Sequence, residues 1–150
     1  MMKVRAYMHK DPKTVTRDLT LREAASLFIS ENVEGLPVVE DGTVVGLVTR
    51  RDLLKLFIPD YMDLIQDVSF LEDFGVLEPE AFFGMEGRLL LIEDVMRGDV
   101  PEISPDSSLL KAAVIMEKNN EDLLVVTDES GVLGVLTRAD VCRAFFGAKK

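Results

Sequence analysis

The sequence predicts a mixed α/β fold of the α+β type, in which two β-α-β-β-α repeats pack with quasi-twofold symmetry and a helical insert lies between them. The first observation is an internal repeat, because VVGLVTRRD at residues 44–52 returns as VLGVLTRAD at 132–140. The second is a helix-period apolar pattern followed by two strand-like runs in each copy. The third is an acidic, aromatic segment, 58–91, that belongs to neither copy.

The duplication covers most of the chain. A shift of 88 positions aligns residues 4–57 with 92–145 without a gap, and fifteen of the 54 aligned pairs are identical, which chance does not produce. We therefore divide the chain into a first repeat at 1–57, the insert at 58–91 and a second repeat at 92–150. Since a unit of about 55 residues buries only about 60% of its surface, the two repeats should share a core as one module.

Each copy is expected to contain the same elements in the same order. The helix from Thr20 has a capping box with Glu23 and an apolar stripe of Leu21, Ala24, Ala25, Phe28 and Ile29. Asp41 and Gly42 mark the tight turn of a hairpin. In the first copy the elements are expected at 14–16, 20–32, 36–40, 43–49 and 51–57, and in the second at 102–104, 109–116, 123–127, 132–137 and from 139 onward.

Composition excludes several classes of protein. The chain has 150 residues, of which 47% are hydrophobic and 29% charged, as in a globular domain. Its longest apolar runs are shorter than the roughly 20 residues of a membrane-spanning helix, and MMKVRAYMHK lacks the apolar core of a signal peptide. We therefore expect a cytoplasmic protein with no membrane partner. The net charge of −10 argues against nucleic-acid binding.

The inventory of reactive residues argues against an enzyme. With His9 as the single histidine and Cys142 as the single cysteine, the sequence offers no Cys-His or Ser-His-Asp set, no Cys/His metal cluster and no Walker-type loop. We expect no catalytic residue and no metal site. Cys142 falls in the apolar pattern of the last helix, so a buried, unreactive thiol is expected.

The motif Gly-hydrophobic-x-Thr-x-x-Asp occurs at Gly46, Thr49 and Asp52 and again 88 positions later. A carboxylate can accept both donors of a ribose diol, while a hydroxyl one turn away can donate to a phosphate oxygen. The start of the following helix also presents free N–H groups to an anion. The alternative is that Thr-x-x-Asp is only a capping box, and both roles are compatible.

This combination resembles the CBS domain family, named after cystathionine β-synthase, and a tandem pair resembles a Bateman module. The resemblance rests on GLVTRRD, GVLTRAD and GLPVV together with Met8 and Met96. It implies a clefted module that binds an adenine nucleotide (AMP, ADP or ATP) or S-adenosylmethionine, with or without magnesium. Such modules report binding to a client protein and often form homodimers; here the implied dimer contacts are the helices at 53–57 and 141–146.

The resemblance also implies site residues. The family's Asp accepts from the ribose and its Thr reaches toward ribose or phosphate, and adenine lies between the first strand and the Gly-hydrophobic-Pro stretch. The second copy has neither Gly nor Pro at the aligned positions, and Glu102 replaces Thr14, so the first site is expected to be the stronger. The first site comprises Thr14, Val15, Gly35, Leu36, Pro37, Thr49, Arg50 and Asp52, and the second Ile103, Leu123, Leu124, Thr137, Arg138 and Asp140.

Phosphate binding also needs cations. Besides the two motif arginines, the segments that precede the first strands carry basic side chains, each of which is either a phosphate ligand or a solvated surface charge. These lead cations are His9, Lys10, Lys13 and Arg97.

The insert 58–91 holds eight acidic residues against the single basic Arg88, and five of the ten aromatic residues of the chain. Its apolar spacing predicts a helical hairpin. This is either a flap that completes the core or a surface for a partner, since aromatic anchors among charges suit a docking site. The leading function is thus a regulatory adenosyl sensor that alters a partner-facing surface. The alternative is a ligand-free dimerisation or scaffold module that acts through the insert.

Overall fold

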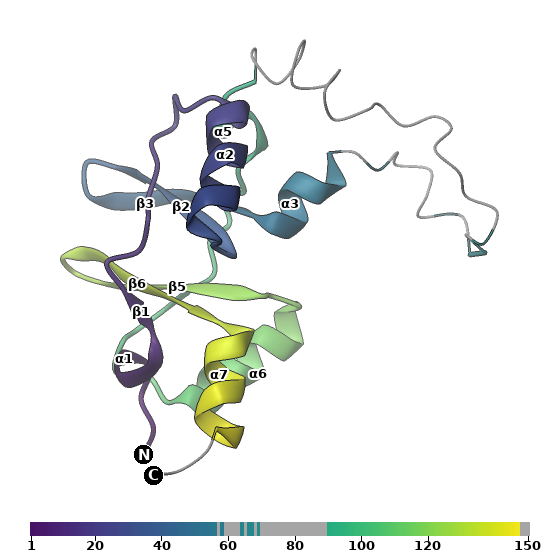
Figure 1. Cartoon of the computed structure of the whole chain (residues 1–150). Coiled ribbons are helices and arrows are strands. Elements are labelled where there is room, and N and C mark those ends of the chain that lie inside the picture. Colours follow the sequence, from purple (N-terminus) through teal and green to yellow (C-terminus); the bar gives the residue numbers. More distant parts are fainter. Residues whose placement is uncertain (57, 59–63, 65, 68, 70–89, 148–150) are drawn as a thin grey trace.

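The computed structural model describes residues 1–56, 58, 64, 66, 67, 69 and 90–147. It has the predicted mixed α+β fold, with two similar halves stacked on each other (Figure 1). Each main element of the second half follows its counterpart by 88 residues. The first half contains α2 (Leu21–Glu31), β2 (Gly35–Glu40), β3 (Thr43–Thr49) and α3 (Arg50–Lys55), and the second contains β4 (Glu102–Ile103), α6 (Leu109–Asn119), β5 (Leu123–Asp128), β6 (Gly131–Thr137) and α7 (Arg138–Phe146).

Helix α2 begins at the predicted capping box. The Thr20 hydroxyl accepts from the Glu23 amide, and the Glu23 carboxylate accepts from the Thr20 amide. The helix buries Leu21, Ala24 and Phe28, as its apolar stripe predicts. The prediction is wrong for Ile29, which is 83% exposed, because eight residues of helix rotate it about 80° away from Leu21 and past the edge of the buried face.

The hairpins form as predicted in both copies. Strands β2 and β3 pair antiparallel, and Asp41 and Gly42 both take positive φ (53° and 80°) in the turn between them. Strands β5 and β6 pair in the same register. The short strand predicted at 14–16 is reduced to a single parallel bridge between Val15 and Val38, whereas its counterpart β4 pairs with β5 over two residues.

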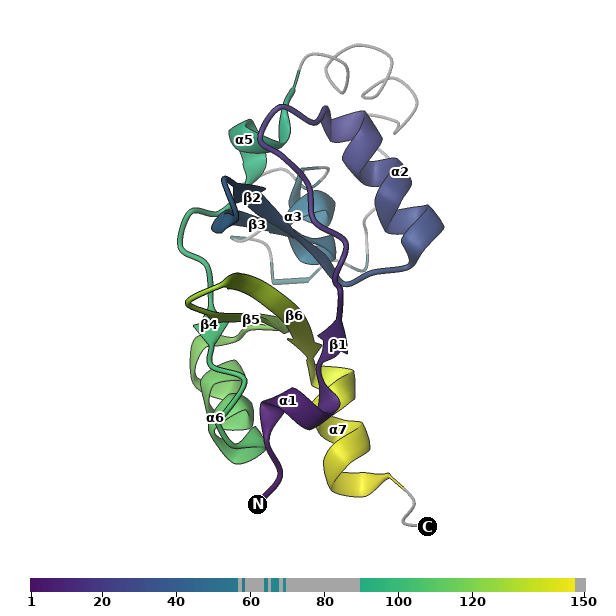
Figure 2. The same ribbon diagram turned by 90° about the vertical axis from the view of Figure 1, so that its left-hand side faces the viewer.

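The segment that leads into each copy packs against the other copy. Three short elements make up these leads: α1 (Val4–Tyr7), β1 (His9–Lys10) and α5 (Ile92–Val95). Strand β1 pairs with β6, and Arg97 forms the equivalent bridge with Leu47 of β3. Figure 2 shows α1 beside α7 in one half and α5 beside β2 and β3 in the other. The two sequence repeats are therefore exchanged at their leading ends.

The exchange brings methionine onto glycine twice. A Cβ atom on Gly46 would lie 2.3 Å from the sulfur of Met96, and one on Gly134 would lie 3.0 Å from the sulfur of Met8 and 2.4 Å from the His9 carbonyl oxygen. These residues form two identical pairs in the repeat, Met8/Met96 and Gly46/Gly134. Each lead lies close against a strand of the other copy, and glycine, which has no side chain, leaves room for it.

Three apolar clusters hold the molecule together. One lies inside each half and includes the exchanged lead, with Val4 in the second half and Ile92 in the first. The third joins the halves through Leu47 of β3 and Leu123 and Val125 of β5. These contacts bury side chains that neither half would cover alone.

Some predictions on the last helices were wrong or fall outside the description. Cys142 is exposed, because Asp140 and Val141 take the buried face of α7 and the next residue turns outward. Helix α3 ends at Lys55, and Phe57 lies outside the described residues. The helical hairpin predicted for the insert also falls largely outside them, so it stays a prediction. Of the helices in the described part, none has the length and apolarity to cross a membrane.

The exchange predicts a graded effect of adding one methyl group. Gly134→Ala should lower the free energy of unfolding by about 1–3 kcal/mol, because the new Cβ meets a backbone carbonyl that cannot move alone. Gly46→Ala should cost less, since the flexible end of Met96 can yield. Gly98→Ala, whose Cβ would meet nothing within 4 Å, is the control. Urea denaturation measures all three, and equal effects would contradict the exchanged packing.

Candidate functional site

Both Thr-x-x-Asp motifs form capping boxes at the starts of α3 and α7. The Thr49 amide donates to Asp52 Oδ2 at 2.9 Å, and the Thr49 hydroxyl donates to the same oxygen at 3.0 Å. The equivalent bonds from Thr137 to Asp140 Oδ2 are 2.8 and 3.0 Å. Both motifs therefore have the predicted capping role, which is compatible with ligand binding, and one oxygen of each carboxylate is committed to the cap.

The other oxygen of Asp140 has two basic side chains beside it. The carboxylate is buried, and His9 Nε2 lies 2.8 Å from its Oδ1. The Arg143 guanidinium donates to the same oxygen. Since His9 comes from the exchanged first lead, the motif of the second copy is completed by the first.

A cleft of about 520 Å³ lies between the two halves beside this carboxylate. We call it the His9 cleft. The first copy supplies the lead segment 9–13, the residues from the end of α2 to the start of β2 (31–35) and Arg50; the second copy supplies Asp122, Leu123, Val135 and residues 137–139. It is a mixed site, to which both copies contribute.

The cations of the His9 cleft have different tasks. Arg50 donates to the Val33 carbonyl oxygen at 2.8 Å and to Asn32 Oδ1 at 2.7 Å, so it fixes the wall of the cleft. Arg138 is likewise engaged by the Glu117 and Asp122 carboxylates, and the hydrogen bond with Glu117 raises its pKa. The exposed Lys10 and Lys13 line the same cleft and form no ion pair within the described residues.

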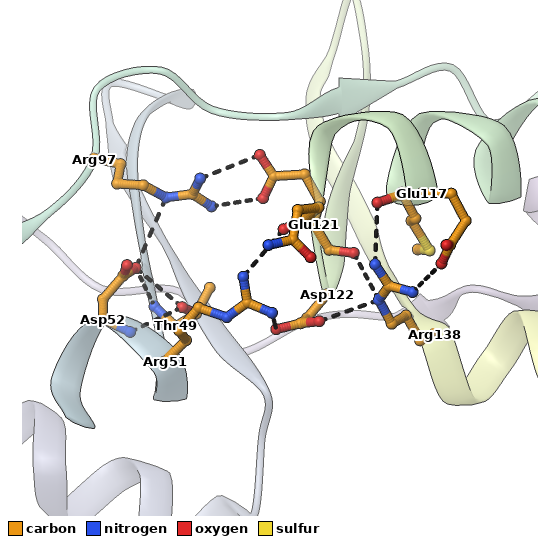
Figure 3. A network of polar contacts seen from close by, with 10 residues as sticks. Thr49, Arg51, Asp52, Arg97, Glu117, Glu121, Asp122 and Arg138 are labelled. Atoms are coloured by element: carbon orange, nitrogen blue, oxygen red, sulfur yellow. Dashed lines mark hydrogen bonds and ion pairs between the residues drawn. The ribbon is translucent and has the colours of Figure 1, made fainter. Parts of the chain in front are cut away.

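A different arrangement surrounds the first motif (Figure 3). Arg97 donates from both terminal nitrogens to Glu121, at 3.1 and 3.2 Å, and its Nε lies 3.8 Å from Asp52 Oδ2. Arg51 of α3 lies 2.7 Å from the Asp122 carboxylate. We call Asp52, Arg97, Glu121, Arg51 and Asp122 the Arg97 cluster. Hydrogen bonding with Glu121 raises the pKa of Arg97.

The Arg97 cluster occupies the place that is equivalent to the His9 cleft. The 88-residue shift relates His9 to Arg97 and Thr137 to Thr49. It also relates Val33, which lines the His9 cleft, to Glu121, which pairs with Arg97. The shift likewise relates Ala139, which lines the cleft, to Arg51 of the cluster, so two charged residues in place of apolar ones accompany the difference between the two places.

The structure regroups the predicted site residues. Five of them line the His9 cleft together and come from both predicted sites, while Asp140 lies directly behind His9. Others are core residues: Val15 and Leu36 pack in the first half, and Ile103 and Leu124 in the second. Asp52 belongs to the Arg97 cluster and Thr49 donates to it, while Thr14 and Pro37 are not among the cleft-lining residues. The five in the cleft are Gly35, Arg50, Leu123, Thr137 and Arg138.

Sequence reasoning missed several residues at these two places. Asn32, Val33 and Glu34 line the His9 cleft only because α2 ends there, and no motif marks them. The pairing of Arg97 with Glu121 had one visible signal, a charge present in the second copy and absent from the first. Within the part of the chain that the structure describes, no group of three or more His, Cys, Asp or Glu residues is arranged to hold a metal ion.

The comparison with protein families settles the membership of the chain. A model of the CBS domain matches residues 4–59 and again residues 92–147. The chain belongs to the CBS domain family. The match covers both halves, so the molecule is a CBS pair, as the sequence motifs predict.

Curated relatives place this CBS pair in proteins of different length. The uncharacterised protein MJ1426 of Methanocaldococcus jannaschii is 32% identical over 90% of this chain and 86% of its own. The uncharacterised protein MJ1232 of the same organism is 29% identical over 92% of this chain but 38% of its own. A homoserine O-acetyltransferase of Methanocorpusculum labreanum is 32% identical over 91% of this chain and 23% of its own. The CBS pair thus spans only a part of some of its relatives.

Solved structures share the fold. The CBS domain pair of protein MJ0100, in complex with 5-methylthioadenosine and S-adenosyl-L-methionine, matches with a TM-score of 0.73 and 24% identity over 99% of both chains. The protein CBSX2 in complex with AMP matches with a TM-score of 0.71 and 24% identity, over 97% of this chain and 96% of its own. Protein MJ1225 of Methanocaldococcus jannaschii matches with a TM-score of 0.74 and 26% identity, over 96% of this chain and 48% of its own.

The capping boxes predict a stability effect that does not depend on any ligand. Thr49→Val and Thr137→Val should each lower the free energy of unfolding by about 1 kcal/mol, because a helix start loses its side-chain acceptor. Thr43→Val, at an exposed strand position, is the matched control. Urea denaturation of the three variants measures the effect, and an unchanged midpoint for both motif variants would contradict the capping role.

Proposed function

We propose that the chain is a regulatory module that binds one adenosyl compound in the His9 cleft. The observation that carries the proposal is the composition of this cleft. It brings the second motif, with Thr137 and Arg138, against the lysine-bearing lead of the first copy. A cleft of about 520 Å³ has the size of a small-molecule site.

The relatives support the choice of ligand class. Among CBS pairs of the same fold, the structure of MJ0100 is a complex with 5-methylthioadenosine and S-adenosyl-L-methionine, and that of CBSX2 is a complex with AMP. For this chain we propose AMP, ADP, ATP or S-adenosylmethionine, and magnesium only as the companion of a polyphosphate.

The residues suggest how such a ligand lies. The ribose hydroxyls would replace His9 at Asp140 Oδ1, the one oxygen that the capping box leaves. Phosphate would meet Lys10 and Lys13, the exposed cations of the cleft. Adenine would lie against Gly35 and Leu123, where the absence of a side chain on Gly35 lets a ring approach the backbone.

The proposed role is regulatory rather than catalytic. Ligand binding would shift the population of two arrangements of the halves, to the extent that the ligand prefers one of them, and would alter the surface offered to a client protein. The expectations of a cytoplasmic location and of no nucleic-acid partner stay predictions from the sequence.

A thermal-shift screen tests the ligand class. With AMP, ADP, ATP, S-adenosylmethionine and GTP, each with and without magnesium, an adenosyl ligand at 100 times its dissociation constant should stabilise the chain by about 2.7 kcal/mol. GTP is the control for base recognition. If none of the adenosyl compounds raised the melting temperature, the result would favour the ligand-free scaffold alternative.

A pair of isosteric variants tests the site. Asp140→Asn should weaken adenosyl binding about tenfold or more, because the ribose loses a charged acceptor. Asp52→Asn is the matched control, since Asp52 is the equivalent residue in the Arg97 cluster. Calorimetry on the folded variants measures both dissociation constants. If Asp52→Asn weakened binding and Asp140→Asn did not, the site would lie at the first motif.

Homodimerisation through α3 and α7 is part of the proposal. Leu54 of α3 is 62% exposed and Phe146 of α7 is 85% exposed, so both helices carry exposed apolar surface that a second copy could bury. Light scattering after gel filtration should give the mass of a dimer for the wild type and of a monomer for Leu54→Asp/Phe146→Asp, because two buried charges are costly at an interface. A monomeric wild type would exclude this interface.

A further inference from the structure

The two equivalent places at the boundary between the halves differ in their contacts. At one, the His9 cleft leaves room between the halves. At the other, a side chain from each half meets in the Arg97 cluster (Figure 3). The main helices and strands around them are related by the 88-residue shift, and the side chains that meet at the boundary differ.

The Arg97–Glu121 pair ties the halves directly. The backbone of Arg97 exchanges two hydrogen bonds of 3.0 Å with Leu47, which fixes Arg97 on the first half. The Glu121 amide donates to the Met116 carbonyl oxygen at 2.9 Å, which fixes Glu121 at the end of α6 in the second half. The two terminal nitrogens of the guanidinium then meet both carboxylate oxygens, in the bidentate geometry of strong ion pairs.

A second contact closes the same boundary. Arg51 of α3, in the first half, lies 2.7 Å from Asp122 and donates to the Asn120 carbonyl oxygen at 3.2 Å, both in the second half. Arg138 takes the other Asp122 oxygen at 3.1 Å. The Asp122 carboxylate is thus engaged by an arginine of each half, and the Glu121 carboxylate by Arg97.

Arg97 lies on the motif carboxylate of the first copy. Its Nε is 3.8 Å from Asp52 Oδ2, is buried, and finds no hydrogen-bond partner among the residues that the structure describes. The guanidinium is therefore well paired with Glu121 and poorly paired with Asp52. At the His9 cleft, the equivalent carboxylate of Asp140 has His9 beside it. Under the proposed function, the ribose takes the place of His9 when the ligand binds.

We infer that the Arg97–Glu121 pair closes a second, latent adenosyl site at Thr49 and Asp52, so that the resting chain offers one site and gains the other when the pair separates. This inference rests on the proposed function. A phosphate group suits the exchange, because Arg97 presents the same two-donor edge to a phosphate as to the Glu121 carboxylate. The pair thereby sets the number of ligands that the module binds.

Calorimetry on the full chain tests the number of sites. With AMP and, separately, with S-adenosylmethionine as probes, the wild type should bind one ligand and Glu121→Ala should bind two. Arg97→Ala opens the site as well, but it removes the proposed phosphate ligand, so S-adenosylmethionine, which has no phosphate, is the probe for this variant. Glu40→Ala is the matched control, because it removes a carboxylate from an exposed pair with Arg17 that lies within the first half.

Hydrogen exchange gives a second measure that needs no ligand. The amide hydrogens of Thr49 and Asp52 should exchange about tenfold faster in Glu121→Ala and Arg97→Ala than in the wild type, since loss of a charge-assisted bond favours opening by about that factor. They should be unchanged in Glu40→Ala.

The outcomes separate the two proposals. One site in the wild type and in both opened variants, or two in the wild type, would overturn the closing role and leave the proposed function intact. No binding by the wild type would count against the proposed function; the closing role would then stand or fall with the exchange rates. Unchanged hydrogen exchange at Thr49 and Asp52 in both opened variants would overturn the closing role of the Arg97–Glu121 pair.

Discussion

The exchange of the leading segments is the constraint on which the rest of the structure depends. Strand β1 pairs with β6, and Arg97 pairs with Leu47 of β3, so each lead is held by the strand of the other copy that runs into the Thr-x-x-Asp motif. A basic side chain from each lead therefore reaches the motif carboxylate of the opposite copy. Neither motif has all its partners within its own repeat, so a ligand bound as proposed would contact both halves of the molecule.

Duplication supplies two equivalent places, and a few substitutions decide what each becomes. The His9 side chain is short and its neighbour Val33 has no charge, so a cleft persists beside Asp140. Arg97 is longer, and Glu121 stands where its fork can reach both oxygens. The pair is partly buried, so water screens it less than a surface ion pair.

Much of the fold could be predicted from the sequence because each helix and hairpin pattern occurs in both copies of the repeat. The helices, hairpins and capping boxes depend on neighbours within about ten residues, and their signals survive in both copies. The regrouping of the site was not predictable, since it follows from the exchange, which depends on contacts between residues far apart in the sequence, such as Arg97 with Leu47 and His9 with Val135. The burial predicted for Ile29 and Cys142 was wrong for a similar reason. Periodicity identifies the apolar stripe of a helix, but it does not show how much of that stripe the other elements cover.

The double use of each motif carboxylate limits how the site can work. One oxygen of Asp140 accepts two hydrogen bonds that start α7, and moving it would cost the helix its cap. A ligand can therefore compete only for Oδ1, where His9 and Arg143 already lie. Its net affinity is the difference between its own hydrogen bonds and those that it displaces, which is small even when each bond is strong. His9 is part of β1, and β1 pairs with β6. The replacement of His9 by the ligand at Asp140 would therefore occur where the two halves are joined. The same atoms that would recognise the ligand are thus placed to transmit its arrival.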